Sequence, residues 1–305
     1  MSPRPVLAST REELADVLAP RRREGAPVGV VTTMGALHEG HASLFRVARE
    51  RVGDGPVVAT IFVNPLQFAA GEDLDRYPRT LETDLAMCER EGVDLVFAPA
   101  VDEVYPGGDP VVTVEPGPLG TELEGASRPG HFRGVLTVVA KLFGLVGPDV
   151  SVFGQKDYQQ LVLVRRMSQD LCLGVEVVGA ETVREPDGLA LSSRNRYLDP
   201  EERQRATVLS RALRAAQQRA AYGLPAARWA AMGVLDEVPE SELDLDYLAI
   251  RTPELEEVKE VHPVDPVAAR ILVAGRVGTT RLIDNLPLTL GGPTSPRTSA
   301  PPTGQ

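Results

Sequence analysis

Short apolar runs rich in β-branched residues alternate with amphipathic helical patterns over the first 185 residues of the chain. The runs that predict strands are 28–33, 57–63, 93–98, 150–153 and 175–178. Between them, apolar residues recur every three or four positions, which predicts helices over 41–52, 80–91, 135–146 and 158–171. This alternation predicts an α/β fold in which a doubly wound parallel sheet is covered by helices.

The pattern changes after residue 199. A long helix rich in Ala, Arg and Gln is predicted over 200–221 and a second helix over 225–236, followed by strands at 246–251 and 270–277. We therefore expect a first domain over 1–185 and a smaller C-terminal α+β domain over 186–290. The last stretch, 291–305, is rich in Pro, Thr, Ser and Gly, and its composition predicts a disordered tail.

Composition narrows the class of function. The chain has 32 basic and 43 acidic residues, and its net charge of −11 argues against a surface that binds nucleic acid. Cys88 and Cys172 lie far apart without CxxC spacing, so we expect two buried thiols in a reducing compartment. No leader pattern and no apolar run long enough to cross a bilayer is present, which predicts a cytoplasmic protein without membrane partners.

Two histidines, His38 and His41, lie in the segment TTMGALHEGH, directly after the first predicted strand. A helix start offers unpaired N–H groups and a positive dipole end, so the pair predicts a phosphate site with two titratable donors. A P-loop is disfavoured because His41 occupies the place of its lysine, and a zinc-protease helix is disfavoured because the spacing is i, i+3. The alternative interpretation is a pair of capping or surface histidines.

Two later segments repeat this arrangement of polar groups after an apolar run. In FGQKDYQQ, Lys156 is placed to reach a phosphate and Asp157 to cap the following helix. In LSSRN, Ser192, Ser193 and Arg194 suit triphosphate oxygens. The alternatives are a solvated lysine beside a helix cap and an ordinary polar turn.

Uncharged amides accompany these cationic groups. Gln67 and Gln160 each offer two donors and one acceptor, which suits a ligand with hydroxyls and a single carboxylate. Asn64 belongs to the same post-strand segment as Gln67. Arg128 and His131, in a loop before a predicted helix, are placed to cover the site when ligand binds, or else are solvated loop residues.

Taken in order, the segments TTMGALHEGH, IFVNPLQF, GEDLDRYPRT, ELEGASRPGHF, FGQKDYQQL, DGLALSSRNRYL and VGTTRLIDN resemble those of the pantoate–β-alanine ligases over residues 28–288. This family belongs to the nucleotidyltransferase superfamily, which also contains the class I aminoacyl-tRNA synthetases. The resemblance implies a Rossmann-like first domain and a homodimer formed through it. It also implies ATP-dependent condensation of (R)-pantoate with β-alanine through pantoyl adenylate, releasing AMP and pyrophosphate, in pantothenate and coenzyme A biosynthesis.

The resemblance also implies roles for individual residues. His41 would donate a proton and His38, Lys156 and Arg194 would contact phosphate, while Gln67 would meet both pantoate and β-alanine. Gln160 would also bind pantoate. Beyond what the resemblance implies, we expect Asn64 and Arg128 to bind pantoate as well. The residues implied to bind ATP are Met34, Gly35, Ala36, Leu37, His38, Glu39, Gly40, His41, Gly154, Gln155, Lys156, Asp157, Val183 (through its backbone), Leu191, Ser192, Ser193 and Arg194. From the chemistry of the reaction we expect Mg²⁺ to bridge phosphate oxygens, with Asp84 as an outer-shell partner of the ion.

Two positions depart from the family pattern, since Thr32 replaces a usual proline and Gln155 replaces a frequent glutamate. Three rival functions are an adenylyl- or cytidylyltransferase acting on a phosphorylated substrate, a tRNA-charging enzyme, and a non-catalytic nucleotide-binding regulator. The first would need basic residues in place of Gln67 and Gln160. The sequence leaves open whether the loop 71–78 closes over the site and whether Tyr77 packs there.

Overall fold

The structure, a computed structural model, describes residues 4–68, 74, 77–259 and 266–292. It divides into two compact units. The first unit comprises Met1–Val183 with Leu191–Ser193, and the second comprises Arg184–Ala190 with Arg194–Gln305. Most of the predicted tail, 293–305, lies outside the described residues.

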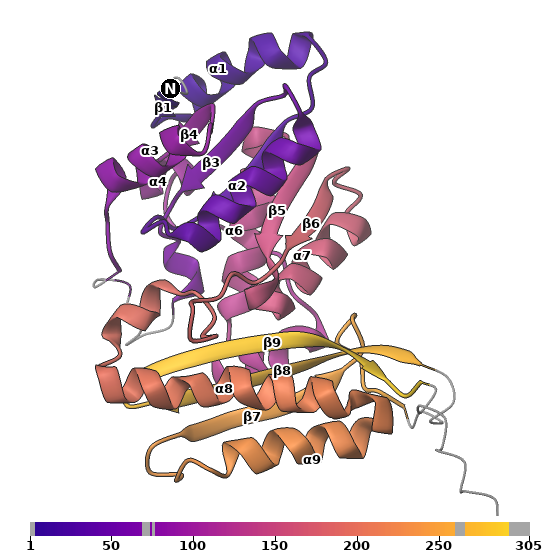
Figure 1. Cartoon of the computed structure of the whole chain (residues 1–305). Helices are drawn as coiled ribbons and strands as arrows, with labels where there is room; N and C mark the ends of the chain where they lie inside the picture. The colour runs from indigo at the N-terminus through magenta and orange to yellow at the C-terminus, as the bar shows by residue number, and fades with distance from the viewer. Residues whose placement is uncertain (1–3, 69–73, 75–76, 260–265, 293–305) are drawn as a thin grey trace, which may run out of the picture. The chain divides into compact units, whose positions relative to one another are not determined.

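The first unit is built on a parallel sheet with the strand order β1-β4-β3-β2-β5-β6 (Figure 1). Its strands, within the described part of the chain, are β1 (Val6–Ala8), β2 (Gly29–Thr33), β3 (Val57–Ile61), β4 (Leu95–Phe97), β5 (Val150–Gly154) and β6 (Glu176–Ala180). The predicted parallel α/β fold is confirmed, with one further short edge strand, β1, that the prediction lacked. The strand order reverses between β2 and β5, and ligands of open α/β sheets bind where such a reversal leaves a crevice at the carboxyl ends.

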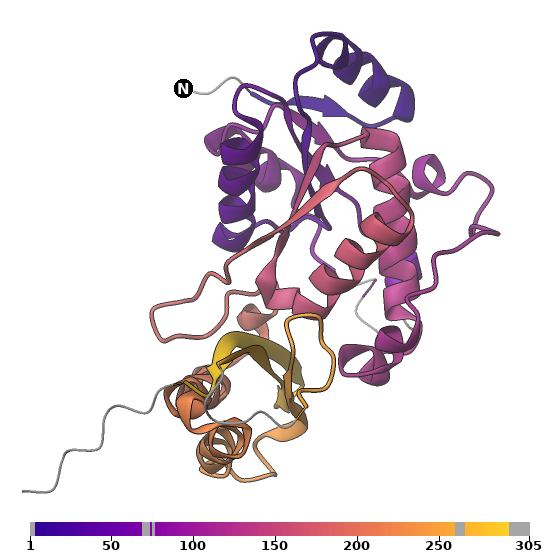
Figure 2. The ribbon, with the colours of Figure 1, turned by 90° about the vertical axis from the view of Figure 1, so that its right-hand side faces the viewer.

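Helices cover both faces of this sheet, as Figure 2 shows for α2 (Glu39–Val52) and α6 (His131–Val146). Phe45 and Ala48 of α2 and Leu85 of α3 (Leu81–Arg90) pack in one buried apolar cluster with residues of β2, β3 and β5. The remaining helices of the first unit are α1 (Arg11–Arg23), α4 (Val101–Val104), α5 (Glu124–Ser127) and α7 (Tyr158–Asp170). Helix α6 starts four residues before the predicted 135, because Gly130 adopts the left-handed conformation (φ 81°) that ends the preceding loop.

The second unit combines two helices with an antiparallel sheet of order β7-β8-β9. The helices are α8 (Pro200–Arg219) and α9 (Leu224–Leu235), and the strands are β7 (Asp244–Arg251), β8 (Val267–Val277) and β9 (Thr280–Leu290). Helix α8 begins at a capping box in which the Asp199 carboxylate accepts hydrogen bonds from the backbone N–H groups of Glu201 and Glu202. The predicted α+β character is confirmed, but the sequence did not predict β9, in which buried residues alternate with partly or fully exposed ones except around the buried pair Asp284 and Asn285.

The structure also bears on the two cysteines and on membrane-spanning helices. Cys88 is buried, but the expectation of a buried Cys172 is wrong, because this residue lies exposed in the turn after α7. No helix among the described residues is long and apolar enough to cross a membrane.

Candidate active site

The chain makes a strained turn where β2 ends. Gly35 and Ala36 both have positive φ, 82° and 52°, and a non-glycine residue in this region costs on the order of 1–3 kcal/mol. The carboxylate of Asp84, on α3, holds the turn: Oδ2 accepts the Ala36 N–H at 3.1 Å and Oδ1 accepts the Leu37 N–H at 2.8 Å. Asp84 is 1% exposed and also accepts a hydrogen bond from the Thr80 hydroxyl. Helix α3 therefore fixes the backbone that leads into the histidine pair.

This geometry shows Asp84 holding the turn, a role that was not predicted for it from the sequence, while its role as an outer-shell partner of Mg²⁺ stays a prediction. Both its oxygens are engaged by the protein, and no group of three or more His, Cys, Asp or Glu side chains that could hold a metal ion occurs among the described residues. The described residues therefore do not form a protein cage for Mg²⁺.

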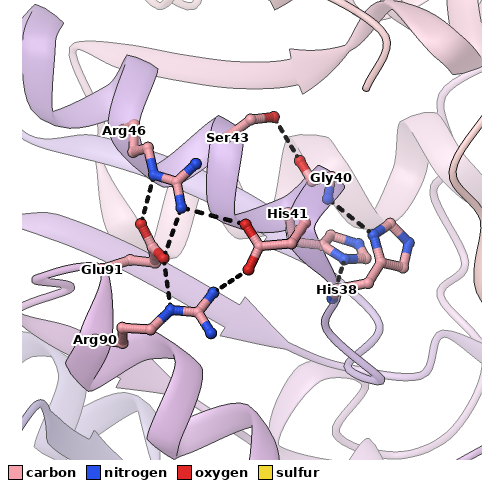
Figure 3. A network of polar contacts seen from close by, with 8 residues as sticks. His38, Gly40, His41, Ser43, Arg46, Arg90 and Glu91 are labelled. Carbon is pink, nitrogen blue, oxygen red and sulfur yellow. Dashed lines mark hydrogen bonds and ion pairs between the residues drawn. The ribbon is translucent and has the colours of Figure 1, made fainter. Parts of the chain in front are cut away.

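The two imidazoles lie at the first turn of α2, with ring centroids 4.1 Å apart (Figure 3). His38 is the N-cap residue, and its Nδ1 accepts the Gly40 N–H at 3.1 Å. The His41 Nδ1 accepts the His38 N–H at 3.2 Å. An imidazole nitrogen that accepts a backbone N–H carries no proton, so each neutral ring must carry its proton on Nε2. The capping interpretation and the phosphate-site interpretation are thus compatible, because capping uses Nδ1 and leaves Nε2–H as the donor.

His41 is neutral in the free protein. Burial, the neighbouring His38 and Lys156 lower its pKa to about 3, against an opposing effect of Asp157. At neutral pH the ring donates a hydrogen bond through Nε2–H rather than carrying a positive charge. Because a bound polyphosphate favours the charged form, an imidazolium that donates its proton can form only after the nucleotide arrives.

A closed set of four alternating charges joins the start of α2 to the end of α3 (Figure 3). Arg46 and Arg90 each contact both Glu39 and Glu91. Burial opposes ionisation of Glu91, whose side chain is only 7% exposed, but the two arginines lower its pKa. Glu39, implied to bind ATP, therefore uses its side chain to tie α2 to α3 next to His38.

The segment after β5 lies close enough to act electrostatically on His41, as Lys156 and Asp157 both affect its pKa. It forms a short 3-10 turn, Gln155–Asp157, with the Lys156 Nζ 3.8 Å from Asp157 Oδ1. The predicted side-chain cap of α7 by Asp157 is wrong, because Asp157 is the N-cap residue but makes no capping hydrogen bond. Gln155, implied to bind ATP, donates its amide to the Gly179 carbonyl on β6.

The third predicted segment is divided between the units. In the first unit, the Leu191 N–H donates to the Val183 carbonyl at 2.9 Å, and Leu191 lies near Gly40, since a Cβ built at Gly40 would be 3.5 Å from Leu191 Cδ2. Arg194 belongs to the second unit, where the neighbouring Asn195 donates to Glu185 Oε1 and the Ala190 carbonyl. Within the first unit, the structure thus brings Leu191 to the histidine turn.

Gln67, at the end of the 3-10 turn Pro65–Gln67 after β3, is held at several points. Its side-chain Nε2 lies 2.9 Å from Met34 Sδ, which places it beside the turn after β2. Its backbone carbonyl faces the His131 Nδ1 at 2.9 Å, and Arg128 Nη1 lies 3.1 Å from the other nitrogen of that ring. Arg128 and His131 therefore both contact the Gln67 segment.

Asn64, predicted to bind pantoate, has all its amide positions engaged by the protein. It donates to Gln67 Oε1 and the Gly134 carbonyl, and accepts from the Leu66 N–H and the Tyr105 hydroxyl. A side-chain amide has only two N–H donors and two acceptor positions, so direct binding of pantoate by Asn64 does not fit this geometry. The Asn64 amide instead holds the side chain of Gln67 through its Oε1.

For Gln160 and for the loop that contains Tyr77, the structure describes the surroundings but not the predicted roles. Gln160 lies partly buried in the first turn of α7, while the neighbouring Gln159 is 2% exposed and holds the loop 119–124 through its amide. Tyr77 packs edge-on against Phe68 with ring centroids 6.2 Å apart. Most of the loop 71–78 lies outside the described residues.

The comparisons with known proteins identify the family of the chain. The family model described as pantoate-beta-alanine ligase matches residues 6–287. The chain belongs to the pantoate–β-alanine ligase family. A pantothenate synthetase of Nocardioides sp. is 69% identical over 295 residues, which cover 95% of this chain and 87% of the relative.

Solved structures of this ligase family share the fold. The crystal structure of pantothenate synthetase from Thermus thermophilus is 52% identical, with a TM-score of 0.83, and the match covers 92% of this chain and 98% of that one. A pantoate-beta-alanine ligase from Francisella tularensis, solved in complex with beta-gamma ATP and beta-alanine, is 31% identical, with a TM-score of 0.73 and coverages of 92% and 97%. The expected family and ligase class are therefore confirmed.

Proposed function

We propose that this chain joins pantoate to β-alanine by way of pantoyl adenylate, and that the turn carrying His38 and His41 is the adenylation site. The observation that carries the proposal is the pair of backbone hydrogen bonds to the two Nδ1 atoms, from which the tautomer follows. Both Nδ1 atoms accept backbone N–H groups, so both rings present Nε2–H donors at the N-terminus of α2. Donors fixed in this way stabilise charge that develops on phosphoryl oxygens without reorganising during the reaction.

In the first half-reaction, a pantoate carboxylate oxygen attacks the α-phosphorus of ATP, and the bond to the bridging oxygen of pyrophosphate breaks. Negative charge grows on the departing pyrophosphate. His41 and His38 donate hydrogen bonds through Nε2, and Lys156 supplies a positive charge. Such groups accelerate the step to the extent that they bind the transition state more strongly than the bound substrate.

In the second half-reaction, the neutral amine of β-alanine attacks the acyl carbonyl of the adenylate. The carbon–nitrogen bond forms, AMP leaves with the bond electrons, and the amine loses a proton. AMP is a far better leaving group than the oxide of a free carboxylate, so this step needs positioning and exclusion of water more than a strong base.

The proposal assigns pantoate to Gln67 and Gln160, with Arg128 as a cationic neighbour, and β-alanine to Gln67. ATP is assigned to the first-unit residues after β2 and β5, with Val183, Leu191, Ser192 and Ser193. The role of Arg194, which belongs to the second unit, stays a prediction. Asn64 positions Gln67 instead of touching ligand. We also propose a cytoplasmic homodimer that pairs through the first unit, as the family resemblance implies.

Magnesium enters this proposal with the nucleotide. The ion prefers oxygen ligands and retains several waters, so ATP phosphates and water satisfy most of its coordination. Asp84 is not needed as a direct ligand in this proposal, and its oxygens accept the Ala36 and Leu37 N–H groups and the Thr80 hydroxyl.

Pyrophosphate–ATP exchange tests the proposal. Purified protein with Mg²⁺ and D-pantoate, without β-alanine, should incorporate labelled pyrophosphate into ATP, and omission of pantoate should abolish the exchange. No exchange with pantoate, together with turnover of a phosphorylated substrate by ATP or CTP, would favour the rival nucleotidyltransferase. ATP binding without either reaction would favour a regulator.

A further inference from the structure

Tyr105 lies behind the proposed pantoate site as part of a buried hydrogen-bonded chain. It follows α4 and is only 3% exposed, with its ring 6.0 Å from that of Phe62 and the Lys141 Nζ 5.3 Å from its centroid. Its hydroxyl donates to Asn64 Oδ1 at 2.8 Å. Burial, with the charge of Asp109, raises the pKa of Tyr105, so the hydroxyl keeps its proton at any physiological pH.

Asn64, held by the Tyr105 hydroxyl, in turn fixes the side chain of Gln67. The orientation of the Asn64 amide is unambiguous, because the Gly134 carbonyl can only accept from Nδ2 and the Leu66 N–H can only donate to Oδ1. In this orientation Nδ2 also donates to Gln67 Oε1 at 3.2 Å. The Tyr105 hydrogen bond, at 2.8 Å, is shorter than the other three that Asn64 makes, which measure 3.2–3.3 Å.

The hydrogen bond from Asn64 also fixes which atoms of the Gln67 amide can face a ligand. Since its Oε1 is occupied by Asn64, the amide presents its Nε2 donors toward Met34 and the turn after β2. Two N–H donors suit a carboxylate or hydroxyl oxygen, whereas a rotated amide would present an acceptor and repel a carboxylate. We propose that Tyr105 is a positioning residue for pantoate, which immobilises Asn64 and thereby keeps the Gln67 amide in its donating orientation.

This inference rests on the proposed function only for the identity of the ligand. Tyr105→Phe removes the hydroxyl and keeps the ring. Loss of one buried hydrogen bond that acts through a second residue should weaken pantoate binding about three- to tenfold. The dissociation constant of a non-hydrolysable ATP analogue should stay within about twofold, because Tyr105, Asn64 and Gln67 are not among the residues proposed to bind ATP. Isothermal titration calorimetry measures both constants, with the analogue present when pantoate is titrated.

A matched variant separates positioning from general stability. Ser168→Ala removes another buried hydroxyl, which donates to the Val175 carbonyl at 2.7 Å. It should leave pantoate affinity unchanged. In the Gln67→Ala background, Tyr105→Phe should have no additional effect on pantoate affinity. Equal weakening of pantoate and ATP analogue by Tyr105→Phe, unchanged pantoate affinity, or a full effect in the Gln67→Ala background would each overturn the inference.

A second readout does not depend on pantoate at all. The side-chain NH₂ resonances of Gln67, assigned by their loss in Gln67→Ala, should shift in ligand-free Tyr105→Phe and stay in place in Ser168→Ala. If these resonances move as expected but wild-type protein binds no pantoate, the proposed substrate is wrong and the positioning role stands. If they do not move, the positioning role is wrong whatever the substrate is.

Discussion

Replacing Asp84 by asparagine should loosen the turn that carries the histidine pair without changing the shape of the side chain. Asparagine keeps one carbonyl oxygen, but its NH₂ group then faces one of the two backbone N–H groups, of Ala36 and Leu37, that the carboxylate accepts. A hydrogen bond to a charged group contributes about 1.5–3 kcal/mol. Losing one raises the local opening constant of the turn roughly 10- to 150-fold.

Native-state hydrogen exchange at the Ala36 and Leu37 amides measures this opening directly. It should be recorded in EDTA, so that no metal ion contributes. Asp149→Asn is the matched control, because Asp149 accepts the Val28 N–H, just before β2, at 2.7 Å. The control should speed exchange at Val28 and leave the turn unchanged.

Two results would contradict this reasoning. Unchanged exchange in Asp84→Asn would mean that the carboxylate does not hold the strained turn. A variant with normal exchange but a raised Mg²⁺ requirement for activity would instead return Asp84 to the metal.

Four further outcomes are expected. His41→Ala should keep the fold and most ATP affinity but lower pyrophosphate exchange steeply; equal loss of binding and turnover would refute its role. Because the pKa of His41 falls from about 6.5 unfolded to about 3 folded, the unfolded chain binds the extra proton between these values. Stability should therefore decline as pH falls from 6.5 toward 3, and urea titrations of His41→Gln should lack that component. Gly134→Ala would place a Cβ 2.2 Å from the Leu66 carbonyl oxygen; it should lower stability by about 1–3 kcal/mol and weaken pantoate binding in calorimetry, with ATP binding retained. Glu39→Gln breaks exposed ion pairs, so thermal unfolding should show a loss below about 1 kcal/mol that high salt removes.

The sequence was informative where one physical signal dominated. The parallel strands β2 and β3 are mostly buried and rich in β-branched residues, and the helices between the strands have a clear period, so the α/β fold could be predicted. Strand β9 was harder because polar residues such as Asp284 and Asn285 interrupt its alternation. Both are buried, and Asp284 pairs with Arg184, a partner 100 residues away that no local pattern indicates.

In the site, too, local features could be predicted from the sequence, whereas contacts between distant residues could not. His38 and His41 follow a strand and open a helix, so chain order alone placed them. The role of Asp84 depends on a contact across 47 and 48 residues, and that of Tyr105 on one across 41. Asn64 lies in the same post-strand segment as Gln67, which led to its prediction as a pantoate ligand. Only the structure shows that four protein groups already bind its amide.

The central claim is that a pantoate carboxylate attacks the α-phosphorus of ATP at the histidine turn. Pantoate labelled with ¹⁸O in its carboxylate tests it most directly, when the full reaction with ATP and β-alanine is run and the products are analysed by mass spectrometry. The account predicts one ¹⁸O in the phosphate of AMP and none in pyrophosphate. Release of ADP with ¹⁸O in inorganic phosphate would show attack at the γ-phosphorus, and would contradict the adenylate.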